Sequence, residues 1–323
     1  MKKIFWRGFI FVALCSIILS SCNEKKSNKV PSTVNIAIQP SAAFIPLYIA
    51  RYKGFMEEAL APMNVTVVWQ DFESGPPINQ SLTADLSDIG VLGDVPAVSA
   101  LSSGGAMKIV GIPASGANAY AMLARADDSS FNSSADMKGK KIATVFGSTG
   151  HNLTKKLLEI NNLSFSDIDF LSIAASEAEN SLIDKTCDAI VIWEPNVTRL
   201  LDSGVAKIVA KGNETDLRGT NAFVVRSEYL AEHSDVINVI LEQYYKAVQT
   251  IPVLDEQTLL KLSKALNISP EQVQKIAKEY NFSITVSKHD IASLQDTVDF
   301  LVSIGNLSAP YNVSTKIENM FDP

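Results

Sequence analysis

An internal repeat constrains the fold of this chain more than any other feature of the sequence. The segment DIGVLGDVPAVSALSSGGAMKIVG, at 88–111, resembles DAIVIWEPNVTRLLDSGVAKIVA, at 188–210. With one residue skipped, both read as Asp, an apolar strand, an acid with a nearby Pro, an apolar helix, a Gly and Lys-Ile-Val. A chance match is the alternative, because strand–helix units look alike in any α/β fold. The shared Lys-Ile-Val favours duplication and predicts two similar α/β lobes.

Further strands extend the two-lobe prediction. VNIAI and KIATV each precede a turn that bears a hydroxyl, and AYAMLAR (119–125) and NAFVVR (221–226) read as strands that cross between lobes. We therefore expect two mixed sheets flanked by helices, with a ligand cleft between the lobes. The expected boundaries are 33–122 and 225–323 for lobe I, 126–221 for lobe II, and a hinge near 122–126 and 221–225.

The first residues have the pattern of a bacterial export signal. Lys2, Lys3 and Arg7 form a basic head before an apolar run, and the stretch ends in Leu-Ser-Ser-Cys at Cys22. This pattern resembles a lipobox and predicts a signal peptide at 1–21, lipid on Cys22 and a flexible tether over 22–32. An ordinary signal with a chance Cys is the alternative. The lipoprotein interpretation predicts an exported chain held at a bacterial membrane, in the periplasm or on the outer face, through its lipid alone.

Composition narrows the classes of partner. Cleavage before Cys22 would leave 25 basic against 35 acidic side chains, a formal charge of −10, which argues against nucleic acid as a partner. Cys187 would be the one unmodified thiol, so no disulfide framework is expected. The three His, at 151, 233 and 289, lack the spacing of metal ligands. We therefore predict no metal, no cofactor and no catalytic residue.

The turn in VFGSTGHNLTKKLLE, at 145–159, is a candidate anion site. It has neither the Lys of a Walker loop nor a fit to G-x-S-x-G. A helix beginning here presents free N–H groups and the hydroxyls of Ser148 and Thr149, which suit an anion. The alternative is that one hydroxyl only caps the helix. Ser41 and the turn at Gly75 and Pro76 are expected to face the same cleft, because ligands bind beyond the carboxyl ends of strands.

Two aromatic and two acidic side chains occur at the corresponding turns. Phe44 and Trp193 are candidates to pack on an organic part of the ligand, with core packing as the alternative for Trp193. Asp94 and Glu194 stand at helix starts, where capping is the expected role and contact with an amine of the ligand is the alternative.

Longer stretches of the sequence resemble a known family. FESGPPINQSLTADLSDIGVLGDVPAV, GSTGHNLTKKLLEINNLSFSDI, AIVIWEP and NAFVVRSEYL are similar to the substrate-binding proteins of ABC importers for nitrate, sulfonates and taurine, most of all to the aliphatic-sulfonate branch. The resemblance covers nearly the whole chain after the signal. The sequence departs from the sulfonate pattern at QPSAAF and at Trp-Glu-Pro, where Trp-Asp-Pro is usual.

This resemblance implies the two-lobed periplasmic-binding-protein fold (type II). A monomer of this fold would close on a small organic anion, an aliphatic sulfonate or a taurine-like compound, and deliver it to an ABC permease and ATPase. The positions that match the family's cleft are Gln39, Ser41, Gly75, Pro76, Gly93, Asp94, Ser148, Thr149, His151, Trp193, Glu194 and Asn221. The alternatives are nitrate or bicarbonate binding, ligand sensing, and an enzyme on the same fold, similar to desulfinases or pyrimidine-synthesis proteins.

Overall fold

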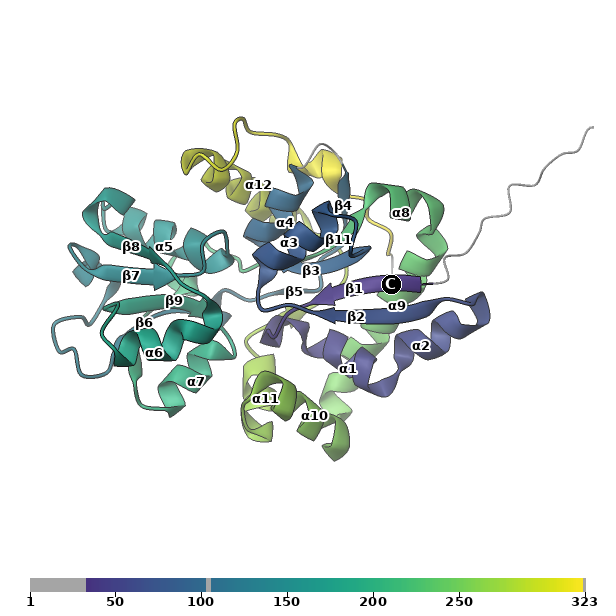
Figure 1. Ribbon diagram of the computed structural model, residues 1–323, viewed down its shortest axis with the longest axis horizontal. Coiled ribbons are helices and arrows are strands. Elements are labelled where there is room, and N and C mark those ends of the chain that lie inside the picture. Colours follow the sequence, from purple (N-terminus) through teal and green to yellow (C-terminus); the bar gives the residue numbers. More distant parts are fainter. Residues whose placement is uncertain (1–32, 103–105, 322–323) are drawn as a thin grey trace, which may run out of the picture.

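The computed structural model describes residues 33–102 and 106–321, so the predicted signal peptide, Cys22 and the whole tether lie outside the described residues. Two five-stranded sheets lie side by side along the long axis of the molecule, each covered by helices (Figure 1). The α/β fold with two mixed sheets is as the sequence predicted.

The first sheet has the order β2–β1–β3–β11–β4. Its strands are β1 (Thr33–Ile38), β2 (Thr66–Asp71), β3 (Ile89–Gly93), β4 (Met107–Gly111) and β11 (Asn221–Arg226). β1 pairs in parallel with β2 and β3, whereas β11 is antiparallel to both of its neighbours.

The second sheet repeats this topology in the order β8–β7–β9–β6–β10. Its strands are β6 (Tyr120–Arg125), β7 (Lys141–Thr144), β8 (Asp169–Ser172), β9 (Ala189–Trp193) and β10 (Ala206–Lys211). β7 pairs in parallel with β8 and β9, and β6 is antiparallel to β9 and β10. The identical order supports the duplication that the repeat predicted, and β3 and β9 are the central strands of the two copies.

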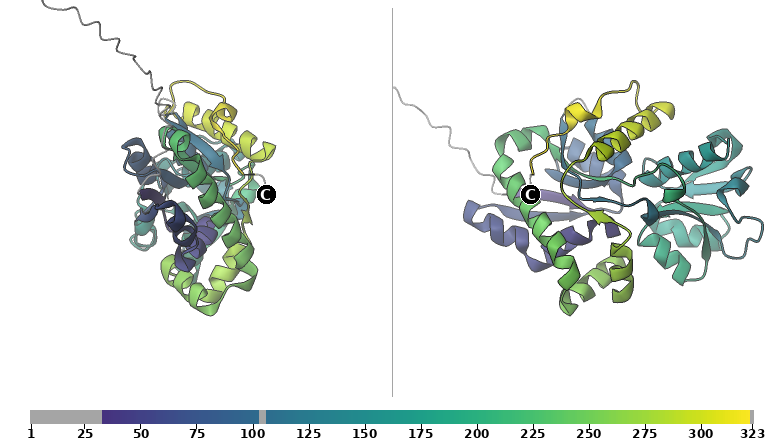
Figure 2. Two further views of the ribbon diagram at one scale, coloured as in Figure 1. Left: turned by 90° about the vertical axis from the view of Figure 1, so that its right-hand side faces the viewer. Right: turned by 180° about the vertical axis from the view of Figure 1, so that it is seen from behind.

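Helices cover both faces of the first sheet (Figures 1 and 2). These helices are α1 (Ile45–Lys53), α2 (Phe55–Leu60), α3 (Gly75–Thr83), α4 (Asp94–Leu101), α8 (Ser227–Glu232), α9 (Ser234–Thr250), α10 (Glu256–Leu266), α11 (Pro270–Ala277) and α12 (Lys288–Ser303). The second lobe has α5 (Thr149–Ile160), α6 (Ala178–Ile183) and α7 (Asn196–Asp202). A two-stranded sheet, β5 (Ala114–Ser115) with β12 (Asn281–Phe282), lies beside the connection between lobes.

The core of the first lobe follows from alternation along its strands. Ile36, Val91 and Phe223 face the hydrophobic cluster that includes α1 and α9. Ala37 and Leu92, their neighbours in sequence, face a second cluster with α3, α4 and α12. Successive side chains of a strand point to opposite faces, so strands that are apolar throughout are buried on both sides.

The structure corrects the predicted lobe boundaries. β6 pairs with β9 and β10 over its whole length, and β11 pairs with β3 and β4. Residues 120–125 therefore belong to the second sheet and 221–226 to the first. The connecting segments are 112–119 and 212–220, earlier than the expected 122–126 and 221–225. They lie side by side, since the Gly116 N–H donates to the Arg218 carbonyl at 3.1 Å.

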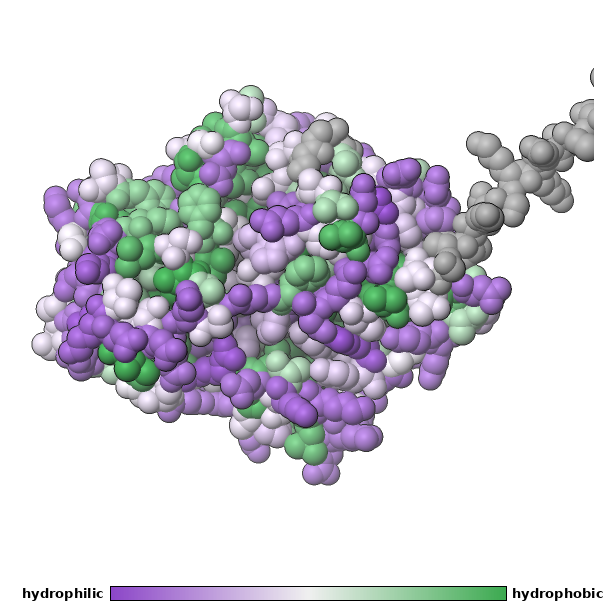
Figure 3. Space-filling view, in the orientation of Figure 1, coloured by the Kyte–Doolittle hydropathy of each residue, from purple (hydrophilic) through white to green (hydrophobic). Residues whose placement is uncertain are grey.

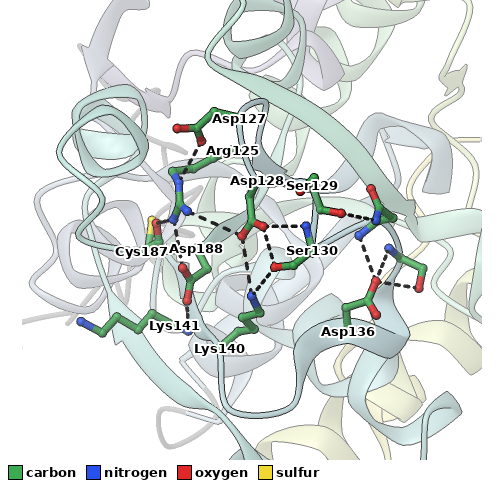
Figure 4. A network of polar contacts seen from close by, with 12 residues as sticks. Arg125, Asp127, Asp128, Ser129, Ser130, Asp136, Lys140, Lys141, Cys187 and Asp188 are labelled. Carbon is green, nitrogen blue, oxygen red and sulfur yellow. Dashed lines mark hydrogen bonds and ion pairs between the residues drawn. The ribbon is translucent and has the colours of Figure 1, made fainter.

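An Asp–Arg pair holds each crossing strand in its sheet. Asp88, directly before β3, accepts the Asn35 backbone N–H at 2.8 Å and Arg226 Nη2 at 2.8 Å. Asp188, directly before β9, accepts the Lys141 backbone N–H at 2.8 Å and Arg125 Nη1 at 2.9 Å (Figure 4). Each Arg is the last residue of its crossing strand. The duplication therefore extends to a matched ion pair that ties the crossing strand to the centre of the sheet.

Among the described residues, no helix has both the length and the apolar character needed to cross a membrane.

We expect Asp88→Ala to lower the free energy of unfolding by about 3 kcal/mol, because it leaves the Arg226 guanidinium without its buried partner. The Asp88 side chain is 8% exposed, whereas Asp71, which pairs with Arg51, is 56% exposed. Asp71→Ala is the matched control and should cost less than about 1 kcal/mol. Urea denaturation of both variants measures the difference, and equal losses would contradict a structural role for Asp88.

Candidate ligand-binding site

A small cavity of about 20 Å³ lies between the lobes at the carboxyl ends of the central strands. Both lobes line it. The lining residues are Gln39, Ser41, Gly75, Gly93, Pro96 and Asn221 from the first lobe and Tyr120, Ser148, Thr149 and Trp193 from the second. None of these side chains carries a formal charge at neutral pH.

The strand topology explains why these residues meet. Gly93 and Trp193 end the central strands β3 and β9. The crossing strands are antiparallel to them, so the first residues of β11 and β6 come to the same edge, where Asn221 pairs with Gly93 and Tyr120 with Trp193. The cavity therefore forms where the equivalent edges of two duplicated sheets face each other.

Helix α5 begins at the cavity. Ser148 caps it, with its Oγ accepting the His151 N–H at 3.4 Å. This is the capping role that the sequence left open as an alternative to anion binding, and Ser148 also lines the cavity. The free N–H groups of the first turn and the helix dipole favour negative charge at this end of α5.

Two buried polar atoms of the lining lack a hydrogen-bond partner among the described residues: Gln39 Oε1 and Trp193 Nε1. Their residues are only 7% and 4% exposed. An unpaired buried polar group costs roughly 1–3 kcal/mol, so native proteins keep few of them without a reason. Since the Gln39 amide can present either its oxygen or its NH₂ group, both side chains are suited to donate to a ligand.

Asp94 bridges the lobes and does not line the cavity. Its carboxylate accepts Thr149 Oγ1 of the second lobe at 2.5 Å, Thr297 Oγ1 of α12 at 3.1 Å and the Val95 N–H at 2.8 Å. Burial raises the pKa of Asp94, and these hydrogen bonds oppose the shift. Asp94 therefore stands at the start of a helix, as predicted, and also connects the two lobes.

Glu194 also lies outside the cavity lining. Its Oε2 accepts the Thr198 N–H at 3.0 Å and its Oε1 accepts Thr198 Oγ1 at 3.0 Å, in the first turn of α7. Burial raises the pKa of Glu194. The carboxylate thus accepts hydrogen bonds from the first turn of α7, as the capping interpretation expected.

Three other predicted site residues are placed away from the lining. Phe44 is fully buried in the core of the first lobe. Pro76 opens α3 and faces Gly147 across the lobe boundary. His151 lies among Phe146, Phe165, Phe170 and Phe300, with ring centroids 4.7–5.3 Å apart. Hydrophobic residues gather on this part of the surface, over α5 and β8 (Figure 3).

Sequence reasoning missed Pro96 and Tyr120. Tyr120 was detectable through the repeat, because AYAMLAR and TNAFVVR align and place Tyr120 opposite Asn221. Pro96 packs against Gly75, where an added Cβ would lie 2.5 Å from Pro96 Cγ. That contact joins α4 to α3, and no local pattern indicates it.

Cys187 is the cysteine that the structure describes, and its thiol is free. Cys187 is fully buried, and burial raises its pKa to about 12. No group of three or more His, Cys, Asp or Glu side chains in the described part of the chain is arranged to hold a metal ion.

The buried His151 predicts a pH dependence of stability. Burial lowers its pKa from 6.5 to about 4, so the folded protein resists protonation and stability is lost as pH falls through this window. Between pH 7.5 and 5 the loss should be about 2 kcal/mol. We expect His151→Phe to remove that loss in urea denaturation, while the exposed His289→Gln retains it. A wild-type loss that persists in His151→Phe would contradict this assignment.

Gly93 lies where the two lobes touch, so a larger side chain at this position should keep them apart. A Cβ at this position would lie 2.5 Å from Thr149 Oγ1 of the opposite lobe and 3.8 Å from Thr149 Cβ. Gly93→Ala should therefore hold the lobes apart and increase the radius of gyration measured by X-ray scattering. In a Thr149→Ala background the same change should have little further effect, because the clashing oxygen is gone. Equal increases in both backgrounds would contradict this contact.

Comparison with known proteins places the chain in a family. The NMT1/THI5-like family model matches residues 41–252. A Bacillus subtilis (strain 168) protein named for binding aliphatic sulfonates is 28% identical, with 99% of this chain and 96% of that protein covered. One of the same name from Escherichia coli (strain K12) is 26% identical, covering 81% of this chain and 80% of that protein.

Solved structures show the same fold. The alkanesulfonate-binding protein SsuA from Xanthomonas axonopodis pv. citri, bound to MOPS, superposes with a TM-score of 0.80 at 23% identity, covering 90% of this chain and 99% of that one. The desulfurization enzyme DszB superposes with a TM-score of 0.65 at 14% identity, covering 89% and 96%. The chain therefore belongs to the NMT1/THI5-like family and has the two-lobed fold of the periplasmic binding proteins.

Proposed function

We propose that this chain is the exported solute-binding component of an ABC importer and captures an aliphatic sulfonate between its two lobes. The observation that carries the proposal is the uncharged cavity shared by both lobes, in which the buried Trp193 N–H has no hydrogen-bond partner among the described residues. Relatives named for binding aliphatic sulfonates support the ligand class.

The chemistry of the lining suits a sulfonate. A sulfonate carries one negative charge spread over three oxygens, each of which accepts hydrogen bonds. Ser41 and Ser148 bring hydroxyls and Trp193 brings its indole N–H, whereas the Thr149 hydroxyl already donates to Asp94. Together with the α5 dipole, these donors compensate one negative charge without a Lys or Arg in the lining. Nitrate and bicarbonate are smaller anions without an organic group.

Closure of the lobes would complete this site. The segments 112–119 and 212–220 connect the lobes, and we assign the hinge to them. Because the lining comes from both lobes, a ligand gains all of its contacts only when the lobes meet, which is the basis of hinge closure. The Asp94–Thr149 hydrogen bond would then form on closing.

A binding role fits these residues better than catalysis. The same fold supports an enzyme in DszB, so the fold alone does not decide. In this chain, however, Cys187 is buried with a raised pKa, and His151 is enclosed by aromatic rings. Neither side chain lines the cavity.

The remaining parts of the proposal concern location and partners. Lipid on Cys22 would hold the protein at the membrane, and a permease with its ATPase would receive the ligand. We propose that it acts as a monomer. Genes for a permease and an ATPase beside the gene for this protein would favour transport over a sensory role.

Trp193→Phe tests the site, since it keeps an aromatic ring and removes the N–H. We expect it to weaken butanesulfonate binding about tenfold or more in titration calorimetry, in line with the loss of a hydrogen bond to a charged group. Trp69→Phe is the matched control, because Trp69 Nε1 donates to Glu57 at 2.7 Å, away from the cavity lining.

Titrations of the wild type with taurine, nitrate and bicarbonate test the ligand class. We expect alkanesulfonates to bind more tightly than either inorganic anion. A protein that binds nitrate or bicarbonate but no sulfonate would refute the sulfonate proposal, and turnover of a bound sulfinate would refute the binding-only role.

A further inference from the structure

A second and larger cavity, of about 360 Å³, lies between the lobes beside the first. Its lining includes Pro40, which stands between Gln39 and Ser41, and Pro195, two residues after Trp193. The two cavities thus share the same turns. The larger one is where the organic part of a ligand held in the smaller one would extend.

Arg199 contributes a guanidinium group to this outer cavity. Of the five arginines that the described residues contain, the other four each pair with at least one carboxylate: Arg51 with Asp71, Arg125 with Asp188, Arg218 with Asp290 and Arg226 with Asp88. Arg199 has no carboxylate within ion-pair distance in the described part of the chain. Its Nη2 donates to Asn196 Oδ1, which leaves its other N–H groups for the cavity.

Burial makes this lack of an ion-pair partner significant. Arg199 is partly buried, and burial lowers the pKa of its guanidinium. A charge that is partly removed from water without a counter-ion costs free energy, so such a group favours an anionic partner. The planar guanidinium donates two parallel hydrogen bonds to a carboxylate or to another anion with paired oxygens.

Two carboxylates, those of Glu73 and Glu179, line the same cavity. Glu73 Oε1 accepts the Ser176 N–H at 3.2 Å and Ser176 Oγ at 2.5 Å, a contact between the lobes. Glu179 is exposed, so water screens its charge from the guanidinium. Neither carboxylate forms an ion pair with Arg199.

We propose that the outer cavity is a second subsite, in which Arg199 receives an anionic group at the far end of the ligand. The preferred ligand class is then an organosulfonate with a second anionic group, such as a terminal carboxylate. Pro40, Pro195 and Leu200 line the path of the aliphatic chain, and Asn267 presents an amide from the first lobe. This inference rests on the proposed function and specifies its substrate class.

Titration calorimetry with two matched ligand series tests the subsite. One series is ethanesulfonate to octanesulfonate, and the other carries a terminal carboxylate at each chain length. We expect the wild type to bind at least one carboxylate-terminated member about tenfold more tightly than its methyl-terminated counterpart. Arg199→Gln should remove this preference and leave the affinity for ethanesulfonate unchanged, because that ligand is too short to reach the outer cavity.

Two further variants control for charge and folding. Arg199→Lys keeps the charge without the planar fork and should retain part of the preference. Lys138→Gln removes one positive charge from a side chain that is 74% exposed and lies outside both cavity linings, so it should bind both series as the wild type does. Thermal unfolding of each variant verifies that it is folded.

The outcomes separate the inference from the function on which it rests. If alkanesulfonates bind but a terminal carboxylate brings no gain at any length, the subsite is refuted and the proposed function stands. A preference that survives in Arg199→Gln refutes the role of Arg199. If no sulfonate of either series binds, the proposed function itself is wrong, and the subsite with it.

Discussion

The Asp–Arg pair in each lobe is the interaction on which the rest of the structure depends. Asp88 with Arg226, and Asp188 with Arg125, fix the ends of β11 and β6 beside the central strands. The opposite ends of these two strands are at the cavity, where they place Asn221 and Tyr120. Each pair therefore sets the register of a strand whose first residue belongs to the candidate site. Because both crossing strands are held in this way, we expect relative motion of the lobes to be confined to the segments between the sheets.

The duplicated topology accounts for a site that neither lobe contains by itself. Each sheet ends in a turn with a hydroxyl and a helix start, and the two edges face each other across the lobe boundary. Asp94 joins them through Thr149. An anion between the lobes meets donors from both, so ligand binding and lobe closure favour each other.

The two adjoining cavities differ in the charge of their linings. The inner one has only uncharged side chains and suits one negative charge, compensated by hydroxyls, an indole N–H and a helix dipole. The outer one has Arg199, which lacks an ion-pair partner in the described part of the chain. In the proposed function the inner lining would hold the sulfonate group, and in our further inference the outer lining would determine which organic group is accepted.

The sequence by itself determined the duplicated strand–helix units, the turns at the carboxyl ends of the strands and eight of the cavity-lining residues. Periodicity and turn chemistry depend on residues that are close in sequence, so they can be recognised from the sequence alone. Only the tertiary structure decided which sheet β6 and β11 join and that Phe44 and His151 pack among apolar groups. It also decided that Arg199 lacks a carboxylate partner within the described residues. Those outcomes depend on contacts between residues far apart in sequence, and pairing across the lobe boundary leaves no periodic signal in either partner.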